Sequence, residues 1–264
     1  MYQRTKVTII TVTYNAQDCL EQTILSVINQ TYPNIEFIII DGDSSDKTID
    51  IIKKYESHID LWISEKDQGI YDAMNKGIEF ANGEWINFMN AGDLFADKDT
   101  ISKVFDKDYL SYDYIYGDRI NKDDVGFFYE KAYPFFLQKK QYCPWKGICH
   151  QSTFVRKAMA QRHKYSLKYK YAGDYEMMYN IYKDGGAFLY RPIAVAIYNQ
   201  TEGFSITGFR KSIIENTMLL GIPLNCKFKI WLEWMCLKNK INTYIKKHFH
   251  IRIKRKKTII NIQP

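Results

Sequence analysis

KVTIITVT, residues 6–13, is a run of mostly β-branched residues, and polar residues follow it at once. A continuous run of this length and composition is typical of a strand buried on both faces of a parallel sheet. Apolar residues then recur at helical spacing over residues 19–29, and a second β-branched run, EFIII, follows at residues 36–40. The order strand, helix, strand predicts a βαβ unit and places the chain among α/β proteins.

The alternation of strands and helices continues beyond this first unit. Periodicity and turn residues predict further helices at about 47–55, 71–80 and 174–183, and further strands at about 61–64, 84–89, 114–117, 126–129 and 187–196. We therefore expect a Rossmann-like, mostly parallel central sheet flanked by helices.

The overall composition is that of a soluble globular protein. The chain has 264 residues, of which 46% are apolar and 25% charged, and this length suits one large α/β domain with an attached segment. Its five cysteines are odd in number and show no CxxC spacing, which indicates neither a disulfide framework nor a structural zinc site. No apolar run approaches the roughly 20 residues that span a bilayer, and no cleavable signal is visible, so we expect a cytoplasmic protein.

Basic residues are concentrated at the C-terminus. Residues 225–264 contain eleven Lys or Arg and the single acid Glu233, although the net charge of the whole chain is only +7. Apolar residues recur there near helical spacing, with lysines between them. We interpret residues 222–264 as a helical, basic, amphipathic segment, which suits a peripheral position on the anionic inner face of the cell membrane. A solvated helix packed on the main domain is the simpler alternative, and nucleic acid is not expected as a partner because no nucleic-acid-binding module accompanies the charge.

Polar residues follow the ends of four predicted strands. They are Thr13-Tyr14-Asn15, the acidic and Ser-rich run 41–46, the run 65–69, and Asn90-Ala91-Gly92-Asp93. Because ligands of such sheets bind beside the carboxyl ends of the strands, we expect these residues to line a common cleft. The cleft is acidic, so a phosphate-containing ligand would require a divalent cation such as Mn²⁺ or Mg²⁺ between carboxylate and phosphate.

Five segments, in this order, resemble the family 2 glycosyltransferases, an inverting group with a GT-A type fold. They are VTIITVTYNA (7–16), LEQTILSVINQTYPNIEFIIIDGDSSDKT (20–48), EKDQGIYDAMNKGIEFANGEWINFMNAGDLF (65–95), CHQSTFVRK (149–157) and AGDYEMM (172–178). The resemblance implies an enzyme that transfers a sugar from a nucleotide diphosphate, with UDP as the expected carrier. The implied acceptor is a hydroxyl of a lipid-linked oligosaccharide or surface polysaccharide such as capsule or lipopolysaccharide.

The resemblance also implies which residues bind the donor. Thr13, Tyr14 and Asn15 would lie beside the base and ribose, and Asp41 would hold the edge of the uracil or ribose. This chain has Asp41-Gly42 where similar proteins often have two adjacent acids. The stretch that contains Asp67, Gln68, Tyr71 and Asn75 would approach the pyrophosphate and the donor sugar.

The cation and the base are implied in the same way. Asn90, Ala91, Gly92 and Asp93 occupy the place of the family's DxD element, so Asp93 would be the metal ligand that bridges cation and diphosphate. Asp174 matches the position of the catalytic base, which removes the proton of the acceptor hydroxyl as that oxygen attacks the anomeric carbon. His150 would be a second contact on the metal side or the acceptor side.

The chain would then consist of a catalytic domain over residues 1–221 and the basic segment 222–264. Within the domain, residues 1–100 would bind the nucleotide and residues 101–221 the acceptor. Two other functions remain open: a nucleotidyltransferase, which should show a Gly-rich phosphate loop after the first strand, and a nucleotide-sugar-binding protein that has lost catalysis with its reduced DxD element. The loop after the first strand begins TYNAQD, and Asp93 and Asp174 are both present, which favours the glycosyltransferase.

Overall fold

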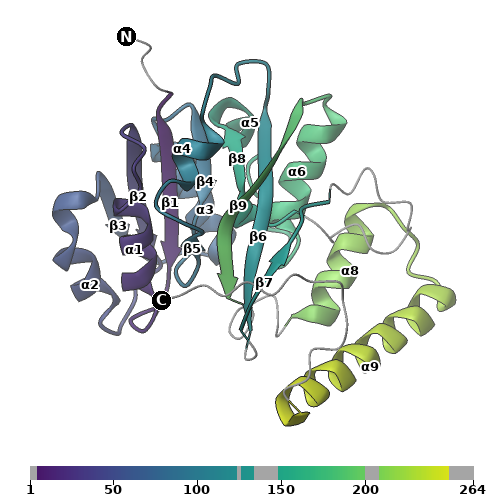
Figure 1. Cartoon of the computed structure of the whole chain (residues 1–264). Helices are drawn as coiled ribbons and strands as arrows, with labels where there is room; N and C mark the ends of the chain where they lie inside the picture. The colour runs from purple at the N-terminus through teal and green to yellow at the C-terminus, as the bar shows by residue number, and fades with distance from the viewer. Residues whose placement is uncertain (1–4, 124–125, 134–147, 200–207, 250–264) are drawn as a thin grey trace.

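The computed structural model of the chain describes residues 5–123, 126–133, 148–199 and 208–249. Within them, strands form one sheet in the order β3-β2-β1-β4-β8-β6-β9-β5, with β7 paired to β6 (Figure 1). The strands are β1 (Val7–Thr13), β2 (Ile35–Asp41), β3 (Leu61–Ser64), β4 (Trp85–Phe88), β5 (Leu94–Phe95), β6 (Tyr114–Asp123), β7 (Gly126–Glu130), β8 (Thr153–Arg156) and β9 (Phe188–Asn199).

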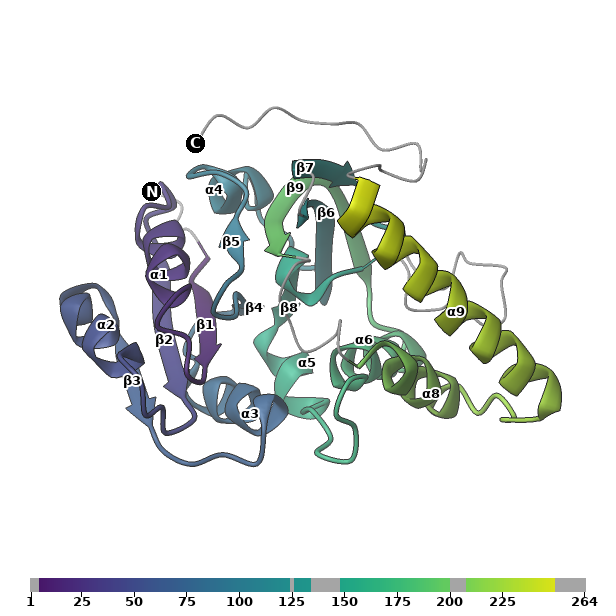
Figure 2. The same ribbon diagram turned by 90° about the horizontal axis from the view of Figure 1, so that it is seen from below.

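The helices lie on both faces of the sheet, apart from α8 (Phe209–Leu219) and α9 (Cys226–Phe249), which pack on each other beside it (Figures 1 and 2). The others are α1 (Leu20–Ile28), α2 (Thr48–Lys54), α3 (Ile70–Phe80), α4 (Thr100–Val104), α5 (Lys157–Arg162) and α6 (Gly173–Lys183), with short 3-10 turns η1 (Glu56–His58) and η3 (His150–Ser152). The expected α/β sheet flanked by helices is confirmed.

Strand β1 lies between two hydrophobic layers, and all seven of its residues are buried. Ile9 belongs to the cluster that α1, α2 and α4 cover, whereas Ile10 belongs to the cluster that α3, α5 and α6 cover. Burying one such side chain stabilises the fold by about 1.5–3 kcal/mol. The continuous β-branched run follows from this double burial, and the buried hydroxyls of Thr8 and Thr11 are tolerated because they donate to Glu36 and to the Met89 carbonyl.

The sheet is parallel in its first half and mixed in its second. Strand β1 pairs in parallel with β2 and β4, and Thr13 lies opposite Asp41 in the register. Strand β8 is antiparallel to β4 and β6, while β6 and β9 are parallel.

The strands expected at 114–117 and 187–196 extend further, to Asp123 and Asn199. The sequence did not predict β5, β8, α4, α5 or α8, of which β5 and β8 have only two and four residues.

The basic C-terminal segment is helical from Cys226 to Phe249, as expected. Phe228 and Leu232 of α9 are buried against Ile213 of α8, in a small core separate from the two layers of the sheet. Residues 250–264 of the segment lie outside the described residues, and the proposed boundary near residue 221 stays a prediction. Among the described helices, none is long and apolar enough to cross a membrane.

A buried carboxylate links β2 to β1 and to the turn before β4. Glu36 accepts hydrogen bonds from Thr8 Oγ1 at 2.6 Å, from the Asn82 backbone N–H at 2.7 Å and from Lys6 Nζ at 3.0 Å. Thr8 Oγ1 in turn accepts the Gly83 N–H at 2.8 Å. Burial alone would raise the pKa of Glu36, but the hydrogen bonds from Thr8, Asn82 and Lys6 prevail and lower it to about 2.

We predict that Glu36→Gln lowers the free energy of unfolding at pH 7 by up to about 3 kcal/mol, the free energy that corresponds to lowering this pKa from 4.5 to about 2. A lowered pKa contributes stability above the unfolded value of 4.5, and that contribution disappears as the pH falls towards 2. Urea unfolding should therefore show the gap between wild type and variant narrowing below about pH 4.5. Glu79→Gln, which alters an exposed ion pair with Lys164, should change little. An equal loss at every pH would contradict this account.

Candidate active site

A cavity of about 960 Å³ lies at the carboxyl ends of β1 and β4 and the N-terminus of α3. Eleven of the residues expected at the site line it, namely Thr13, Tyr14, Asn15, Asp67, Gln68, Tyr71, Asn90, Ala91, Gly92, Asp93 and His150. The structure therefore brings together residues that the sequence separates by more than a hundred positions.

The loop after β1 forms one wall of the cavity. Thr13 Oγ1 is buried and has no hydrogen-bond partner among the described residues, whereas the ring of Tyr14 is 65% exposed. Asn15 has a positive φ of 47°, which Asn tolerates better than most residues. Its side-chain oxygen accepts the Ser45 N–H at 2.9 Å, and its own N–H donates to Ser44 Oγ at 2.8 Å. Asn15 therefore fixes the loop after β1 to the loop after β2. The Thr13 hydroxyl and the Tyr14 ring remain available for contact with a ligand in the cavity.

Asp41 lies beneath this wall and not among the residues that line the cavity. It is fully buried and accepts hydrogen bonds from the Ser44 N–H at 2.9 Å and from Ser64 Oγ at 2.7 Å. It thus connects the loop after β2 to the end of β3. At the neighbouring Gly42 a Cβ would lie 2.6 Å from the Asp67 carboxylate, so a larger residue would require the Asp67 side chain to move.

Asn75 also lies outside the lining. Its Nδ2 donates to the Tyr165 carbonyl at 2.8 Å, and its Oδ1 accepts the Tyr165 N–H at 2.9 Å. Both polar atoms of the side chain therefore hold the segment between α5 and α6 against α3. For Asp41 and Asn75, direct contact with the donor stays a prediction.

The turn 90–93 is fixed by contacts with β1 and α1. The Ala91 N–H donates to the Val12 carbonyl, and the hydroxyl of the buried Thr23 both accepts the Gly92 N–H and donates to the Asp93 carbonyl. Gly92 has a φ of +96°, which a residue with a side chain rarely adopts. The turn presents Asn90 and Asp93 to the cavity.

Asp93 is an unusually buried carboxylate for a cavity wall. It is 7% exposed, and its Oδ2 accepts a hydrogen bond of 2.7 Å from Gln151 Nε2. Burial raises the pKa of Asp93 to about 6, although the hydrogen bond from Gln151 and the nearby His150 oppose the rise. The carboxylate is therefore ionised near neutral pH, but its contacts with Gln151 and His150 do not fully offset the loss of hydration on burial. A cation beside it would be favourable.

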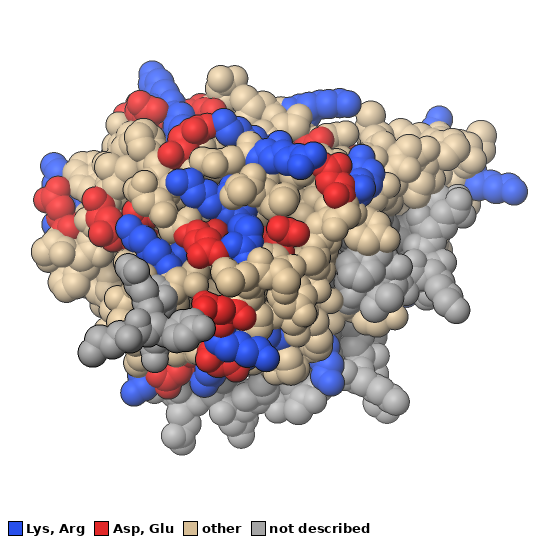
Figure 3. Space-filling view, turned by 90° about the horizontal axis from the view of Figure 1, so that it is seen from above, with Lys and Arg blue, Asp and Glu red and all other residues tan. Residues whose placement is uncertain are grey.

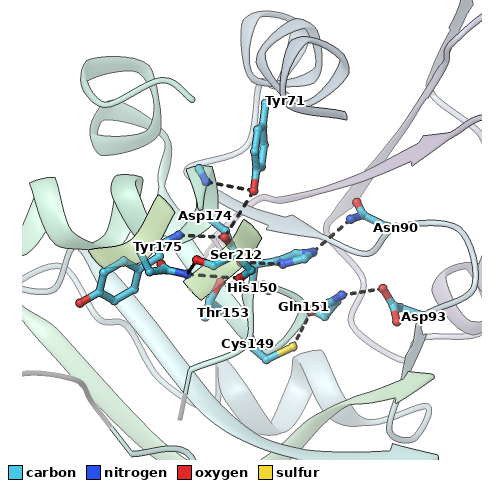
Figure 4. A network of polar contacts seen from close by, with 12 residues as sticks. Tyr71, Asn90, Asp93, Cys149, His150, Gln151, Thr153, Asp174, Tyr175 and Ser212 are labelled. Atoms are coloured by element: carbon cyan, nitrogen blue, oxygen red, sulfur yellow. Dashed lines mark hydrogen bonds and ion pairs between the residues drawn. The ribbon is translucent and has the colours of Figure 1, made fainter. Parts of the chain in front are cut away.

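A chain of polar contacts joins Asn90 to Asp174 through His150, which lines the cavity (Figure 4). His150 Nε2 lies 3.0 Å from Asn90 Nδ2, and His150 Nδ1 lies 3.3 Å from Asp174 Oδ2. Because an amide nitrogen donates, Nε2 accepts, and the ring proton lies on Nδ1, where it faces the carboxylate. Both ring nitrogens of His150 are thus engaged, which fits the acceptor side of the site better than a metal ligand.

Asp174 stands in the first turn of α6 and is not among the residues that line the cavity, but it contacts two that do, His150 and Tyr71. Its Oδ1 accepts the Tyr175 N–H at 2.9 Å and lies 3.5 Å from the Tyr71 hydroxyl, which itself accepts the Gly173 N–H at 2.9 Å. The partial positive charge at a helix N-terminus favours a carboxylate at this position. Gly173 permits the close approach of α3, because a Cβ there would lie 2.7 Å from the Tyr71 ring.

The segment that leads into α6 forms the opposite wall, where Leu167, Tyr169 and Lys170 line the cavity. The carboxylate of Glu215, from α8, accepts the backbone N–H groups of residues 170, 171 and 172 at 2.6–3.2 Å. Helix α8 therefore holds in place the backbone that carries both this wall and Asp174.

Several lining residues were not predicted from the sequence: Cys19, Gln151, Leu167, Tyr169, Lys170, Tyr198 and Asn199. Gln151 carried a signal, since it lies in the CHQS segment next to His150. The others belong to no motif, and only the folded chain brings them to the cavity.

The residues at the turn 90–93 fit a cation that is shared with a ligand. No group of three or more His, Cys, Asp or Glu side chains that would hold a metal occurs in the described part of the chain. The oxygen donors here are the Asp93 carboxylate and Asn90 Oδ1, a buried atom with no hydrogen-bond partner among the described residues. Hard cations such as Mg²⁺ are commonly held by one or two protein oxygens together with substrate phosphates.

Comparisons with known proteins agree with this geometry. The sequence model described as "Glycosyl transferase family 2" matches residues 8–165. The chain is 29% identical over 231 residues to a PGL/p-HBAD biosynthesis glycosyltransferase of Mycobacterium bovis, which covers 85% of this chain and 86% of that protein.

Two solved structures share the fold. S. aureus TarS 1–349 in complex with UDP-GlcNAc has a TM-score of 0.62 at 16% identity, over 94% of this chain and 76% of that one. The mannosyltransferase PcManGT from Pyrobaculum calidifontis, in complex with GDP-Man and Mn²⁺, has a TM-score of 0.60 at 16% identity, over 79% of this chain and 61% of that one.

The raised pKa of Asp93 predicts that ionisation of this carboxyl group destabilises the folded, metal-free protein. Between its unfolded value of 3.8 and its folded value of about 6, the folded state binds more protons, so stability falls as the pH rises through this range. Asp93→Asn removes the ionisable group and with it this destabilisation. We expect the variant to gain up to about 3 kcal/mol over wild type at pH 8 and almost nothing at pH 4, as measured by urea unfolding in EDTA.

Asp97→Asn is the matched control, because Asp97 is close in sequence but exposed and paired with Lys103. It should show no such trend with pH. A loss of stability in Asp93→Asn that is the same at pH 4 and pH 8 would mean that Asp93 serves the fold through Gln151 alone.

Proposed function

Because the chain belongs to glycosyl transferase family 2 and has the GT-A type fold, it is a glycosyltransferase, and we propose that it is an inverting enzyme whose cavity binds a UDP-sugar. The observation that carries the proposal is the position of Asp174, which contacts the two lining residues His150 and Tyr71 and is separated by the His150 ring from the turn that holds Asn90 and Asp93. A base and a diphosphate site on opposite sides of a sugar are what inversion requires.

The donor would lie along the ends of β1 and β4. The exposed ring of Tyr14 offers a flat face for the base, and the buried Thr13 hydroxyl offers a hydrogen bond that no described residue satisfies. Asp67 and Gln68, ahead of α3, would lie beside the donor sugar. Residues 1–100 would thus supply the donor side, and residues 101–221 the acceptor side.

The diphosphate would lie at the turn 90–93. A divalent cation, Mn²⁺ or Mg²⁺, would be held by Asp93 and Asn90 together with the diphosphate, and when bound it would stabilise negative charge on the leaving group. A positive charge beside Asp93 would also relieve the unfavourable burial of that carboxylate.

Asp174 would act as the general base. Its Oδ1 accepts the Tyr175 N–H of α6 and its Oδ2 faces His150 Nδ1, so its oxygens are oriented before the acceptor arrives. As the acceptor oxygen attacks the anomeric carbon, its proton passes to Asp174, and the bond from that carbon to the diphosphate oxygen breaks. Attack from the face opposite the leaving group inverts the anomeric configuration.

The acceptor would be a hydroxyl of a lipid-linked oligosaccharide or surface polysaccharide. Leu167 and Tyr169, in the wall formed by the segment that leads into α6, would supply the apolar and aromatic surface on which sugar rings pack. A lipid-linked acceptor would place the enzyme at the inner face of the cell membrane.

We predict that Asp174→Asn lowers the turnover number for transfer by about 10²–10⁴-fold, the usual worth of a general base, and leaves UDP-sugar affinity nearly unchanged. Glu176→Gln, two residues along the same helix, is the matched control and should transfer normally, because the contacts with His150 and Tyr71 are made by Asp174. Transfer assays and calorimetric titrations with the donor separate the two effects. Unchanged transfer by Asp174→Asn would remove Asp174 from the mechanism.

The stereochemistry of the product gives an independent prediction. An α-linked UDP-sugar should yield a β-linked product, because a single displacement inverts the anomeric carbon. Proton NMR of the product, recorded early in the reaction, distinguishes the two anomers. An α-linked product would contradict the single-displacement mechanism.

A further inference from the structure

Helix α9 carries an exposed apolar stripe. Ile230, Trp234, Leu237 and Ile241 are 72%, 55%, 57% and 48% exposed. Their spacing of four, three and four residues places them on one side of the helix. We refer to these four residues as the α9 stripe.

The α9 stripe is distinct from the face with which α9 packs on the protein. Phe228 and Leu232 are 1% and 3% exposed and contact α8 through Ile213. At 100° per residue they lie on the side of the helix opposite Ile230 and Ile241. The helix is therefore apolar on two opposite faces, and packing against α8 explains only one of them.

Lysines border the α9 stripe on both sides. By helix geometry, Lys227 and Lys238 lie along one edge and Lys229 and Lys240 along the other, and all four are exposed. The Nζ of Lys238 lies 5.0 Å from the centroid of the Trp234 ring. The single acid of the helix, Glu233, is paired with Arg210 of α8 at 2.6 Å, so it offsets little of this charge.

We propose that the α9 stripe binds the surface of an anionic lipid bilayer. Apolar side chains between two rows of lysines match the acyl boundary and the anionic headgroups of such a surface. A second copy of the chain fits less well. The spacing would suit a coiled coil, but the residues that flank its seam are mainly lysines, which would repel one another.

The position of α9 is compatible with work at a membrane. The helix lies at the end of the molecule towards which β1 runs, the end at which the cavity is formed (Figures 1 and 2). At the opposite end, acidic and basic side chains are intermingled and form no surface of one sign (Figure 3). A bilayer that contacts α9 would therefore lie at the end of the molecule where the cavity is formed, the end at which a lipid-linked acceptor of the proposed function would be needed.

Sedimentation of the whole protein with phosphatidylcholine vesicles, with and without about one third phosphatidylglycerol, tests the proposal. Wild type should sediment with the anionic vesicles and much less with the neutral ones. Leu237→Ser with Ile241→Ser should lower the partition coefficient at least about tenfold, and Lys238→Gln with Lys240→Gln should lower it on anionic vesicles only. Leu110→Ser, at a 74% exposed leucine outside α9, is the matched control and should bind like wild type.

Equal binding by wild type and the Leu237→Ser, Ile241→Ser variant, or no binding of wild type to anionic vesicles, would overturn the proposal. Light scattering after size exclusion identifies the alternative, since a wild-type dimer that this variant dissociates would assign the stripe to a second copy. Sedimentation needs no nucleotide sugar. A failure to bind vesicles therefore leaves the transferase proposal intact, and a failure of sugar transfer leaves the vesicle result intact.

Discussion

The burial of β1 on both faces is the constraint on which the site depends. Ile9 and Ile10 face opposite hydrophobic layers, and the hydroxyls of Thr8 and Thr11 are paired inside the protein, so the strand presents a polar group without a partner among the described residues only where it ends, at Thr13. The parallel pairing with β2 and β4 aligns the ends of those strands with it. Loops of different lengths then leave the sheet at one edge, and the cavity forms between them.

The second half of the chain contributes to the cavity at this edge through side-chain hydrogen bonds as well as through strand pairing. Gln151 donates to Asp93, and His150 lies between Asn90 and Asp174, so the short segment before β8 contacts both walls of the cavity. Glu215 of α8 holds the backbone before α6. The Asp93 carboxylate in the wall of the cavity and the Asp174 carboxylate behind His150 thus keep fixed positions, and the cavity is large enough for a nucleotide sugar.

The sequence predicts the part of this arrangement that depends on local pattern. The four strands β1 to β4 and helices α1 to α3 have strong periodicity, and the residues after the strands, such as Tyr14 and Asp93, follow from their place at the edge. Pairings between distant segments, such as Asn75 with Tyr165 or Glu215 with residues 170–172, leave no periodic signal. The same limit holds for α9, because helical spacing does not tell which apolar face packs on α8 and which stays exposed.

Calorimetric titration of the wild-type protein with a panel of nucleotide diphosphate sugars, with and without Mn²⁺, tests the central claim most directly. The account predicts that at least one UDP-sugar binds with one-to-one stoichiometry and that Mn²⁺ strengthens its binding. Asp93→Asn should lose that gain from Mn²⁺. If no nucleotide sugar binds in either condition, the cavity at the ends of β1 and β4 is not a donor site, and the proposed function is wrong.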